Sequence, residues 1–224
     1  MHIVRGRTHE ALSRDQLVDQ TAPYARVVLD VGAGDGAWAY RHAAAHPDDF
    51  VIAIDPVAEN VREWSAKAAK KAGKGGLPNV LFVVGSVEQP PPELRAVADE
   101  IVVTLPWGSL MRGLILGDDV VLAGVASFGR DGARVRIVLN TRIYDDPVPI
   151  EARDLPDLTS EYVRDTLGPA YARQGIEITD ARPMLADEVT AIGTTWGKRL
   201  SHRRPPPSML IEAVVHAPAP ATGG

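Results

Sequence analysis

A glycine-rich stretch, DVGAGDG at residues 30–36, is the part of this 224-residue chain best suited to hold a ligand. Glycine lets the backbone turn tightly and lets a ligand approach it closely. The spacing G-x-G-x-G lacks the third glycine of the dinucleotide fingerprint. Pyrophosphate binds helix amides away from carboxylates, so Asp30, Asp35 and the later Asp55 favour a ligand with an ammonium group and a ribose. S-adenosylmethionine carries both.

Two tryptophans stand in loops where a planar substrate could bind. Trp107 lies in LPWGS (105–109), directly after an apolar run, and Trp196 lies in TTWGKR (194–199). A single tryptophan is more often part of a core, and the helical pattern around Trp64 predicts that role, while Trp38 has no assigned role. Two rings on facing loops could stack a nucleobase, each contributing roughly 1–3 kcal/mol.

The residue that precedes Pro106 bears on which atom could react. Methyltransferases for exocyclic amines commonly carry Asn or Asp there, because that side chain accepts a hydrogen bond from the amine. This chain has Leu105. The sequence therefore favours a ring nitrogen, whose lone pair is already free, over an exocyclic amine.

Basic residues gather in two segments although the net charge is -5. Lys67, Lys70, Lys71 and Lys74 recur at helical spacing, which predicts one face of one helix. The other group, Arg199, Arg203 and Arg204, follows the second tryptophan and joins phosphate-binding charge to a stacking ring. A solvated helix face is the alternative reading of the lysines. Together the two groups indicate a footprint on structured nucleic acid.

Alternating strand and helix patterns must position these residues. Short apolar runs at 27–31, 50–54, 80–84, 100–104 and 135–139 alternate with helical patterns, which is typical of a parallel sheet covered on both faces. Two later runs, 176–179 and 209–215, predict a C-terminal hairpin. Residues 3–5 and those after Gly6 predict a small N-terminal hairpin. Ser13 with Gln16 predicts a capped helix, and Thr159 begins another that runs to about Gln174.

Composition excludes several classes of protein. With no cysteine, the chain can form neither a disulfide scaffold nor a thiolate zinc site. Of its six histidines only His42 and His46 stand four residues apart, and no metal is expected. Ser109 lacks a His/Asp partner for nucleophilic catalysis. No apolar run approaches the roughly 18 residues of a membrane helix, and the first residues lack the apolar core of a signal peptide. We expect a cytoplasmic protein without membrane contact.

Several stretches resemble the aminoglycoside-resistance 16S rRNA (adenine(1408)-N1)-methyltransferases of the Kam type. They span most of the chain, and the combination of LPWGSL, GKGGLPN and the late TTW is far more specific than the glycine loop. The matching stretches are VLDVGAGDG (28–36), AIDP (53–56), SAKAAKKAGKGGLPNVLF (65–82), LPWGSLMRG (105–113) and TTWGKRLSHRR (194–204).

The resemblance implies an α/β, Rossmann-like class I methyltransferase fold. It consists of a seven-stranded, mostly parallel sheet with an antiparallel C-terminal hairpin, plus an N-terminal β-hairpin. The expected organisation is an extension at 1–24, the methyltransferase domain at 25–217 with an inserted segment at about 144–158, and a flexible tail at 218–224.

The resemblance also implies the ligands and the residues that bind them. The family binds S-adenosylmethionine and methylates a decoding-site adenine in the assembled small ribosomal subunit; we expect a monomer. Trp107 and Trp196 would sandwich the flipped adenine, and the seven lysines and arginines named above would contact rRNA. The expected cofactor site comprises Asp30, Gly32, Gly34, Asp55, Pro56, Val87, Glu88, Thr104, Leu105, Pro106, Trp107, Ser109, Thr194, Thr195 and Trp196. Val87, where the family often has Ala, and Trp38, where a polar residue is more usual, are departures.

The expected reaction is an in-line attack of adenine N1 on the sulfonium methyl. N1 is unprotonated at neutral pH, so no general base is required. Two alternatives remain: a methyltransferase for another RNA, such as a tRNA guanine-N7 enzyme, and a catalytically silent module that binds the cofactor and the ribosome. A nicotinamide oxidoreductase fits poorly, because no proton-donor group accompanies the glycine loop.

Overall fold

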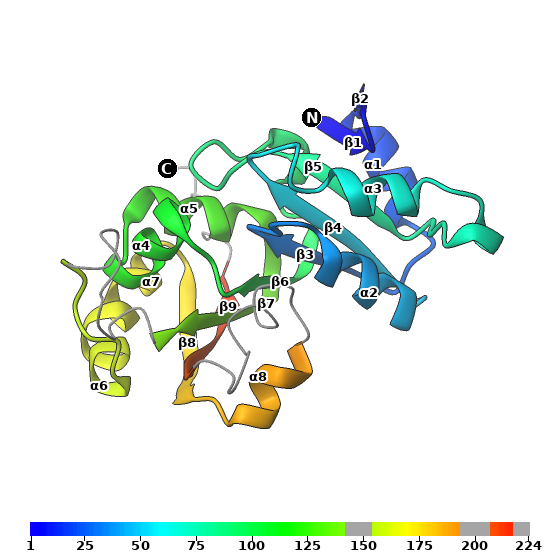
Figure 1. Ribbon diagram of the computed structural model, residues 1–224. Helices are drawn as coiled ribbons and strands as arrows, with labels where there is room; N and C mark the ends of the chain where they lie inside the picture. The colour runs from blue at the N-terminus through cyan, green and yellow to red at the C-terminus, as the bar shows by residue number, and fades with distance from the viewer. Residues whose placement is uncertain (142–153, 193–206, 217–224) are drawn as a thin grey trace, which may run out of the picture.

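The computed structural model describes residues 1–141, 154–192 and 207–216, and these form one mixed sheet flanked by helices (Figure 1). The strand order is β2-β1-β5-β4-β3-β6-β7-β9-β8. Pairing is parallel from β5 through β4, β3 and β6 to β7, and antiparallel elsewhere. The strands are β1 (His2–Arg5), β2 (Thr8–Ala11), β3 (Arg26–Val31), β4 (Asp49–Asp55), β5 (Val80–Val84), β6 (Ala98–Thr104), β7 (Gly129–Asn140), β8 (Ile176–Pro183) and β9 (Ser208–Val215).

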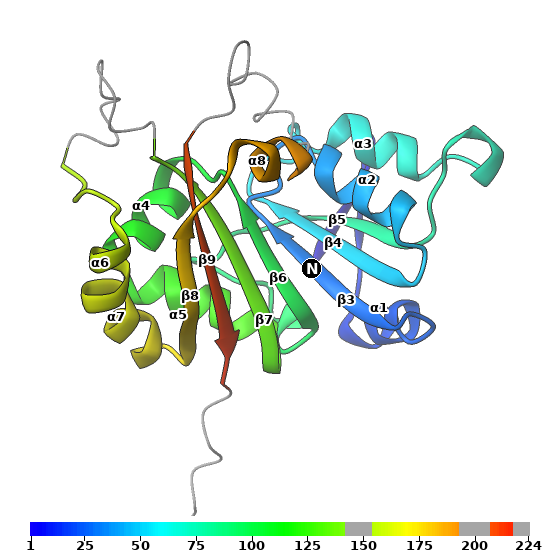
Figure 2. The same ribbon diagram turned by 90° about the horizontal axis from the view of Figure 1, so that it is seen from below.

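Helices pack on both faces of this sheet because neighbouring residues of its strands point to opposite sides. On β4, Phe50, Ile52 and Ile54 enter the larger core, whereas Val51 and Ala53 enter a second core beneath α2 and α3 (Figure 2). The helices are α1 (Arg14–Thr21), α2 (Ala37–Ala45), α3 (Arg62–Ala68), α4 (Gly108–Leu116), α5 (Asp119–Phe128), α6 (Ser160–Tyr162), α7 (Gly168–Arg173) and α8 (Ala186–Ile192), with short 3-10 turns η1 (Ala72–Lys74) and η2 (Pro92–Leu94). No helix in these described ranges is both long and apolar enough to cross a bilayer.

The predicted α/β fold is confirmed, including both hairpins. The seven strands from β3 to β9 form the expected sheet, and the N-terminal hairpin adds two more by pairing β1 with β5. Ser13 and Gln16 form the expected capping box. Thr159 caps α6, which continues through a π-helical turn η5 (Val163–Leu167) into α7. The division of the chain at residues 24 and 217 stays a prediction; the tail and most of the 144–158 insertion lie outside the described residues.

The prediction that Lys67, Lys70, Lys71 and Lys74 share one helix face is wrong. Helix α3 ends at Ala68, whose carbonyl accepts a hydrogen bond from the Leu77 N–H at 3.0 Å. Gly76 packs so closely on this turn that a Cβ there would lie 1.6 Å from the Lys70 carbonyl oxygen. The chain therefore turns back over the end of α3, and the last three lysines lie in a loop and 3-10 turn.

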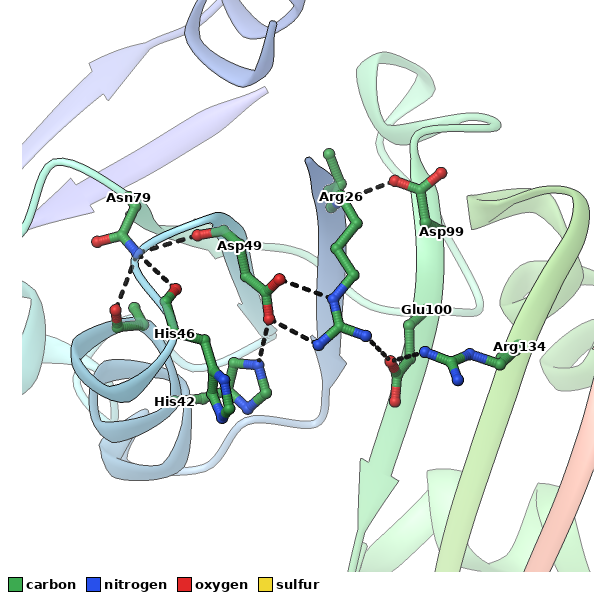
Figure 3. A network of polar contacts seen from close by, with 10 residues as sticks. Arg26, His42, His46, Asp49, Asn79, Asp99, Glu100 and Arg134 are labelled. Atoms are coloured by element: carbon green, nitrogen blue, oxygen red, sulfur yellow. Dashed lines mark hydrogen bonds and ion pairs between the residues drawn. The ribbon is translucent and has the colours of Figure 1, made fainter. Parts of the chain in front are cut away.

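A polar network joins the amino ends of β3, β4 and β6 (Figure 3). The Arg26 guanidinium donates two hydrogen bonds to Asp49 at 2.7 and 2.8 Å and a third to Glu100, which also accepts from Arg134. The bond from Arg26 lowers the pKa of Asp49. Beside it, the buried Asn79 amide donates to the backbone carbonyls of Ala43, His46 and Asp49. These bonds fix the sheet edge opposite the glycine loop.

We expect Asn79→Ala to lower the free energy of unfolding by about 1–3 kcal/mol, because it leaves buried carbonyls without a donor. Urea denaturation of the purified protein measures this loss. Asn79→Asp is the matched control: it keeps the shape but removes the donor, and it should be at least as destabilising. A loss below about 0.5 kcal/mol for Asn79→Ala would mean that other donors replace the amide.

Candidate functional site

A cleft of about 450 Å³ opens where β3, β4 and β6 end. In a parallel sheet the carboxyl ends of the strands share one edge, and ligands bind there. Ten residues expected at the cofactor site line this cleft: Asp30, Gly32, Gly34, Asp55, Pro56, Thr104, Leu105, Pro106, Trp107 and Ser109. The expected Thr194, Thr195 and Trp196 lie outside the described residues, as do Arg199, Arg203 and Arg204.

The glycine loop bounds the cleft with its backbone. Gly32, Gly34 and Gly36 all have positive φ, which accounts for their alternate spacing. At Gly34 a Cβ would meet nothing within 4 Å, so the loop borders open space at that point. The Gly34 N–H donates to Asp55 Oδ2 at 2.9 Å and so ties the loop to the end of β4.

Asp30 is buried at the end of β3 and faces this cleft. Its Oδ2 has no hydrogen-bond partner within the described part of the chain. Burial, reinforced by the charges of Asp55 and Asp35, raises the pKa of Asp30 to about 8. A buried carboxylate without a donor is costly unless a cation or donor reaches it. The site therefore fits a ligand that brings an ammonium group.

Asp55 is suited to a ligand with hydroxyl groups. Its carboxylate accepts from the N–H groups of Gly34 and Val57 and from the Asn60 amide at 3.1 Å. A carboxylate has about four acceptor positions, so one remains for a ribose hydroxyl. Burial raises the pKa of Asp55, and these three hydrogen bonds oppose the rise. Sequence reasoning missed Asn60, which lies only five residues after Asp55, because no motif marked its amide.

The turn after β6 holds its central residue in an uncommon conformation. Leu105 has a φ of +49°, in the left-handed region that side chains with a Cβ rarely adopt. Its N–H donates to the Val138 carbonyl at 2.8 Å, which fixes the turn against β7. Such strained residues gather at functional sites. Two residues later Trp107, the N-cap residue of α4, has 50% of its surface exposed, so its ring is available to a substrate.

Val87 and Glu88 lie beside the cleft, outside its wall. Val87 is buried and lines a small adjoining recess of about 40 Å³ together with Gly32 and Pro56. Glu88 accepts a hydrogen bond from the Ser109 hydroxyl at 2.8 Å. Burial opposes ionisation of Glu88, but its hydrogen bonds outweigh burial and lower its pKa. This contact links the loop after β5 to the first turn of α4.

The two remaining tryptophans differ in position. Trp64 packs against the second core, as the helical pattern predicted. Trp38, which the sequence left without a role, lines the cleft near the glycine loop, and its ring lies 4.8 Å from that of His42. Other cleft residues that sequence reasoning did not select are Ala33, Val57, Asn60, Gly108 and Leu110, and Asp35, which it noted only for its charge, lines the cleft too. Most of them adjoin a selected residue, and that adjacency is the signal that could have found them.

Comparison with known proteins decides the family. Residues 2–215 match the family model of the 16S rRNA (adenine(1408)-N(1))-methyltransferases. The chain belongs to this family. It is 42% identical over 190 residues to the enzyme of that name from Streptoalloteichus hindustanus, covering 85% of this chain and 86% of the relative. It is 33% identical over 205 residues to the one from Escherichia coli, covering 91% and 94%.

Solved structures of the family agree with the fold. A tryptophan-to-alanine mutant of the 16S rRNA (adenine(1408)-N(1))-methyltransferase from Catenulisporales acidiphilia, crystallised with cosubstrate SAM, matches with a TM-score of 0.93 at 35% identity. The match covers 98% of this chain and 99% of that one. The 16S rRNA methyltransferase KamB matches with a TM-score of 0.88 at 34% identity, covering 97% and 100%. The resemblance drawn from the sequence motifs is therefore confirmed.

In this member of the family, Asp30→Asn should weaken cofactor binding and stabilise the ligand-free protein. The pKa of Asp30 is about 8 in the folded state against 3.8 for a free side chain. Between these values the folded chain holds a proton that the unfolded chain releases, so the free energy of unfolding falls as pH rises. The Asn side chain does not ionise, so the variant does not lose this free energy of unfolding, which at neutral pH amounts to a few kcal/mol.

Urea unfolding from about pH 5 to about pH 8 measures the stability effect, and calorimetry with S-adenosylmethionine measures binding. The Asn variant should show a flatter pH dependence and weaker binding. Asp35→Asn is the matched control, because Asp35 also adjoins the loop but is not buried. Cofactor binding by Asp30→Asn equal to that of the unaltered protein would contradict the role assigned to Asp30.

Proposed function

We propose that this protein transfers a methyl group from S-adenosylmethionine to N1 of adenine 1408 in 16S rRNA and so confers aminoglycoside resistance. Its substrate is the assembled 30S subunit, on which it acts as a monomer. The observation that carries the proposal is the buried Asp30 at the glycine-loop cleft of a chain in this family, whose Oδ2 has no partner among the described residues. That feature fits a ligand that brings an ammonium group, which a generic nucleotide does not.

The residues that would hold the cofactor fit its groups one by one. Asp30 would accept from the ammonium group and Asp55 from the ribose hydroxyls. Val87 and Glu88 would border the adenine, with Glu88 held by Ser109. Pro56, Thr104, Pro106, Thr194 and Thr195 would complete the walls. When bound, S-adenosylmethionine supplies a methyl group activated by the adjacent sulfonium.

The substrate base would be held by stacking rather than by acid–base groups. Trp107 presents a half-exposed ring beside the cleft, and Trp196 would supply the opposite ring. Their π faces favour the positive charge that develops on the methylated adenine, worth roughly 0.5–2 kcal/mol. Leu105 offers no side-chain acceptor for an exocyclic amine. The chain's contribution is thus to flip, hold and orient the base, because N1 already carries a free lone pair.

Binding to the ribosome would depend on two basic segments. Lys70, Lys71 and Lys74 are exposed on the loop after α3, and Lys67, the fourth lysine expected to contact rRNA, is partly exposed at the end of α3. Arg199, Arg203 and Arg204 would add phosphate contacts next to Trp196. The chain is acidic overall, so a local basic surface of this kind is what allows it to approach rRNA.

The deciding experiment measures transfer of labelled methyl from S-adenosylmethionine to purified bacterial 30S subunits, free 16S rRNA and tRNA. Primer extension across the decoding site then locates the methyl group. We expect label on 30S subunits and a reverse-transcriptase stop at adenine 1408, because an N1 methyl blocks Watson–Crick pairing. Label on tRNA alone would favour the guanine-N7 alternative, and no label on any RNA would favour the silent module.

Trp196→Ala should abolish most turnover while cofactor affinity survives. The loss of one stack, roughly 1–3 kcal/mol, corresponds to about a 5- to 150-fold lower rate. Trp196→Phe is the matched control and should retain an intermediate rate, since it keeps a ring. Single-turnover methylation of 30S subunits and calorimetry with S-adenosylmethionine separate the two effects. Lost cofactor affinity with intact turnover would count against the sandwich.

A further inference from the structure

The ammonium group of Lys67 lies over two aromatic rings at the end of α3. Its Nζ is 4.5 Å from the ring centroid of Tyr40 and 4.7 Å from that of Trp64. The two rings are themselves 4.9 Å apart. A cation within about 6 Å of a ring centroid is attracted to its face, so the Lys67 ammonium already interacts with two rings within the protein. We call Tyr40, Trp64 and Lys67 the aromatic clamp.

The aromatic clamp also holds the chain that follows α3. The buried Tyr40 hydroxyl donates to the Gly75 carbonyl at 2.7 Å. Gly75 has a φ of +86°, and a Cβ there would lie 3.1 Å from that hydroxyl and 3.4 Å from Lys67 Cε. The end of this loop therefore rests directly on the aromatic clamp, and a side chain at Gly75 would both crowd the Tyr40 hydroxyl and be strained by the positive φ.

The loop at residues 69–76, here the basic loop, presents the three exposed lysines. Its shape is closed by hydrogen bonds from the Lys74 and Gly76 N–H groups to the Lys71 carbonyl, at 2.8 and 3.1 Å. In the ranges that the structure describes, no carboxylate forms an ion pair with Lys70, Lys71 or Lys74. Their charges are therefore available to an external anion, whereas the charge of Lys67 is held over the rings.

We propose that the aromatic clamp is a positioning device that holds the basic loop in the shape that binds rRNA. Tyr40, Trp64 and Lys67 act on the loop, and Lys70, Lys71 and Lys74 contact phosphates. A loop that is already ordered loses less entropy when it binds, so the aromatic clamp raises affinity without touching RNA. This inference rests on the proposed function, since it assumes that the basic loop meets the 30S subunit.

The test measures the affinity of the full chain for 30S subunits across a range of KCl concentrations at fixed Mg²⁺. Each phosphate contact adds about 0.7–0.9 to the slope of log Kd against log salt. Four variants are compared: Tyr40→Phe, Lys67→Met, Lys67→Arg and Lys71→Met. Lys71→Met is the matched control for Lys67→Met, because the same charge is removed from an exposed lysine without ring contacts. Affinity for S-adenosylmethionine confirms that each variant is folded.

We expect Tyr40→Phe to weaken 30S binding roughly three- to tenfold, because it removes one buried hydrogen bond and keeps the ring. Its salt slope and its kcat at saturating subunits should not change. Lys67→Met should also weaken 30S binding without changing the salt slope, and Lys67→Arg should restore affinity because it returns a cation to the rings. Lys71→Met should instead lower the slope by about one contact.

Three results would overturn the proposal. If Lys67→Met lowers the slope as much as Lys71→Met, Lys67 is a phosphate ligand; if Tyr40→Phe binds 30S subunits as tightly as the unaltered protein, the aromatic clamp does not position the loop. An unchanged slope for Lys71→Met would also overturn it, since the basic loop would then not meet RNA. Failure of the proposed function is a separate observation: the unaltered protein would leave 30S subunits unmethylated.

Discussion

The structure depends on one buried acid at the end of β3, Asp30, whose Oδ2 has no hydrogen-bond partner among the described residues. β3 is a central strand, with β4 on one side and β6 on the other, so its end is enclosed on both sides by neighbouring chain. A carboxylate in that place without a donor destabilises the folded protein. The glycine loop, Asp55 and the turn at Leu105 surround it, and together they leave space for a ligand that brings the missing positive charge.

At the opposite edge of the same sheet, the carboxylates have partners within the protein. There Asp49 and Glu100 are both paired with guanidinium groups, and the Asn79 amide satisfies three backbone carbonyls. Polar groups at this edge stabilise the strands, whereas Asp30 and Asp55 at the cleft keep acceptor positions for a ligand. The parallel arrangement separates the two roles, because it gathers all amino ends at one edge and all carboxyl ends at the other.

The two segments expected to bind substrate are each held in place by a hydrogen bond to a neighbouring strand or helix. Leu105 is kept in a strained conformation by a hydrogen bond to β7, and this turn presents Trp107 at the start of α4. The basic loop is supported by Tyr40 from α2. In both places a rigid element carries an exposed group that would meet RNA. This agrees with a reaction in which orientation, rather than proton transfer, is the main requirement.

The sequence alone determined the elements whose signals are local. Apolar runs predicted the strands, alternate glycines predicted the ligand loop, and Ser13 with Gln16 predicted the start of α1, because each pattern acts within a few residues. Only the tertiary structure decided that α3 stops at Ala68 and that Lys67 lies over two rings. Each depends on a partner that the fold brings near, Leu77 for Ala68 and Tyr40 for Lys67. Helical spacing predicted one face for four lysines, but such a tertiary contact outweighs the small free energy of local propensity.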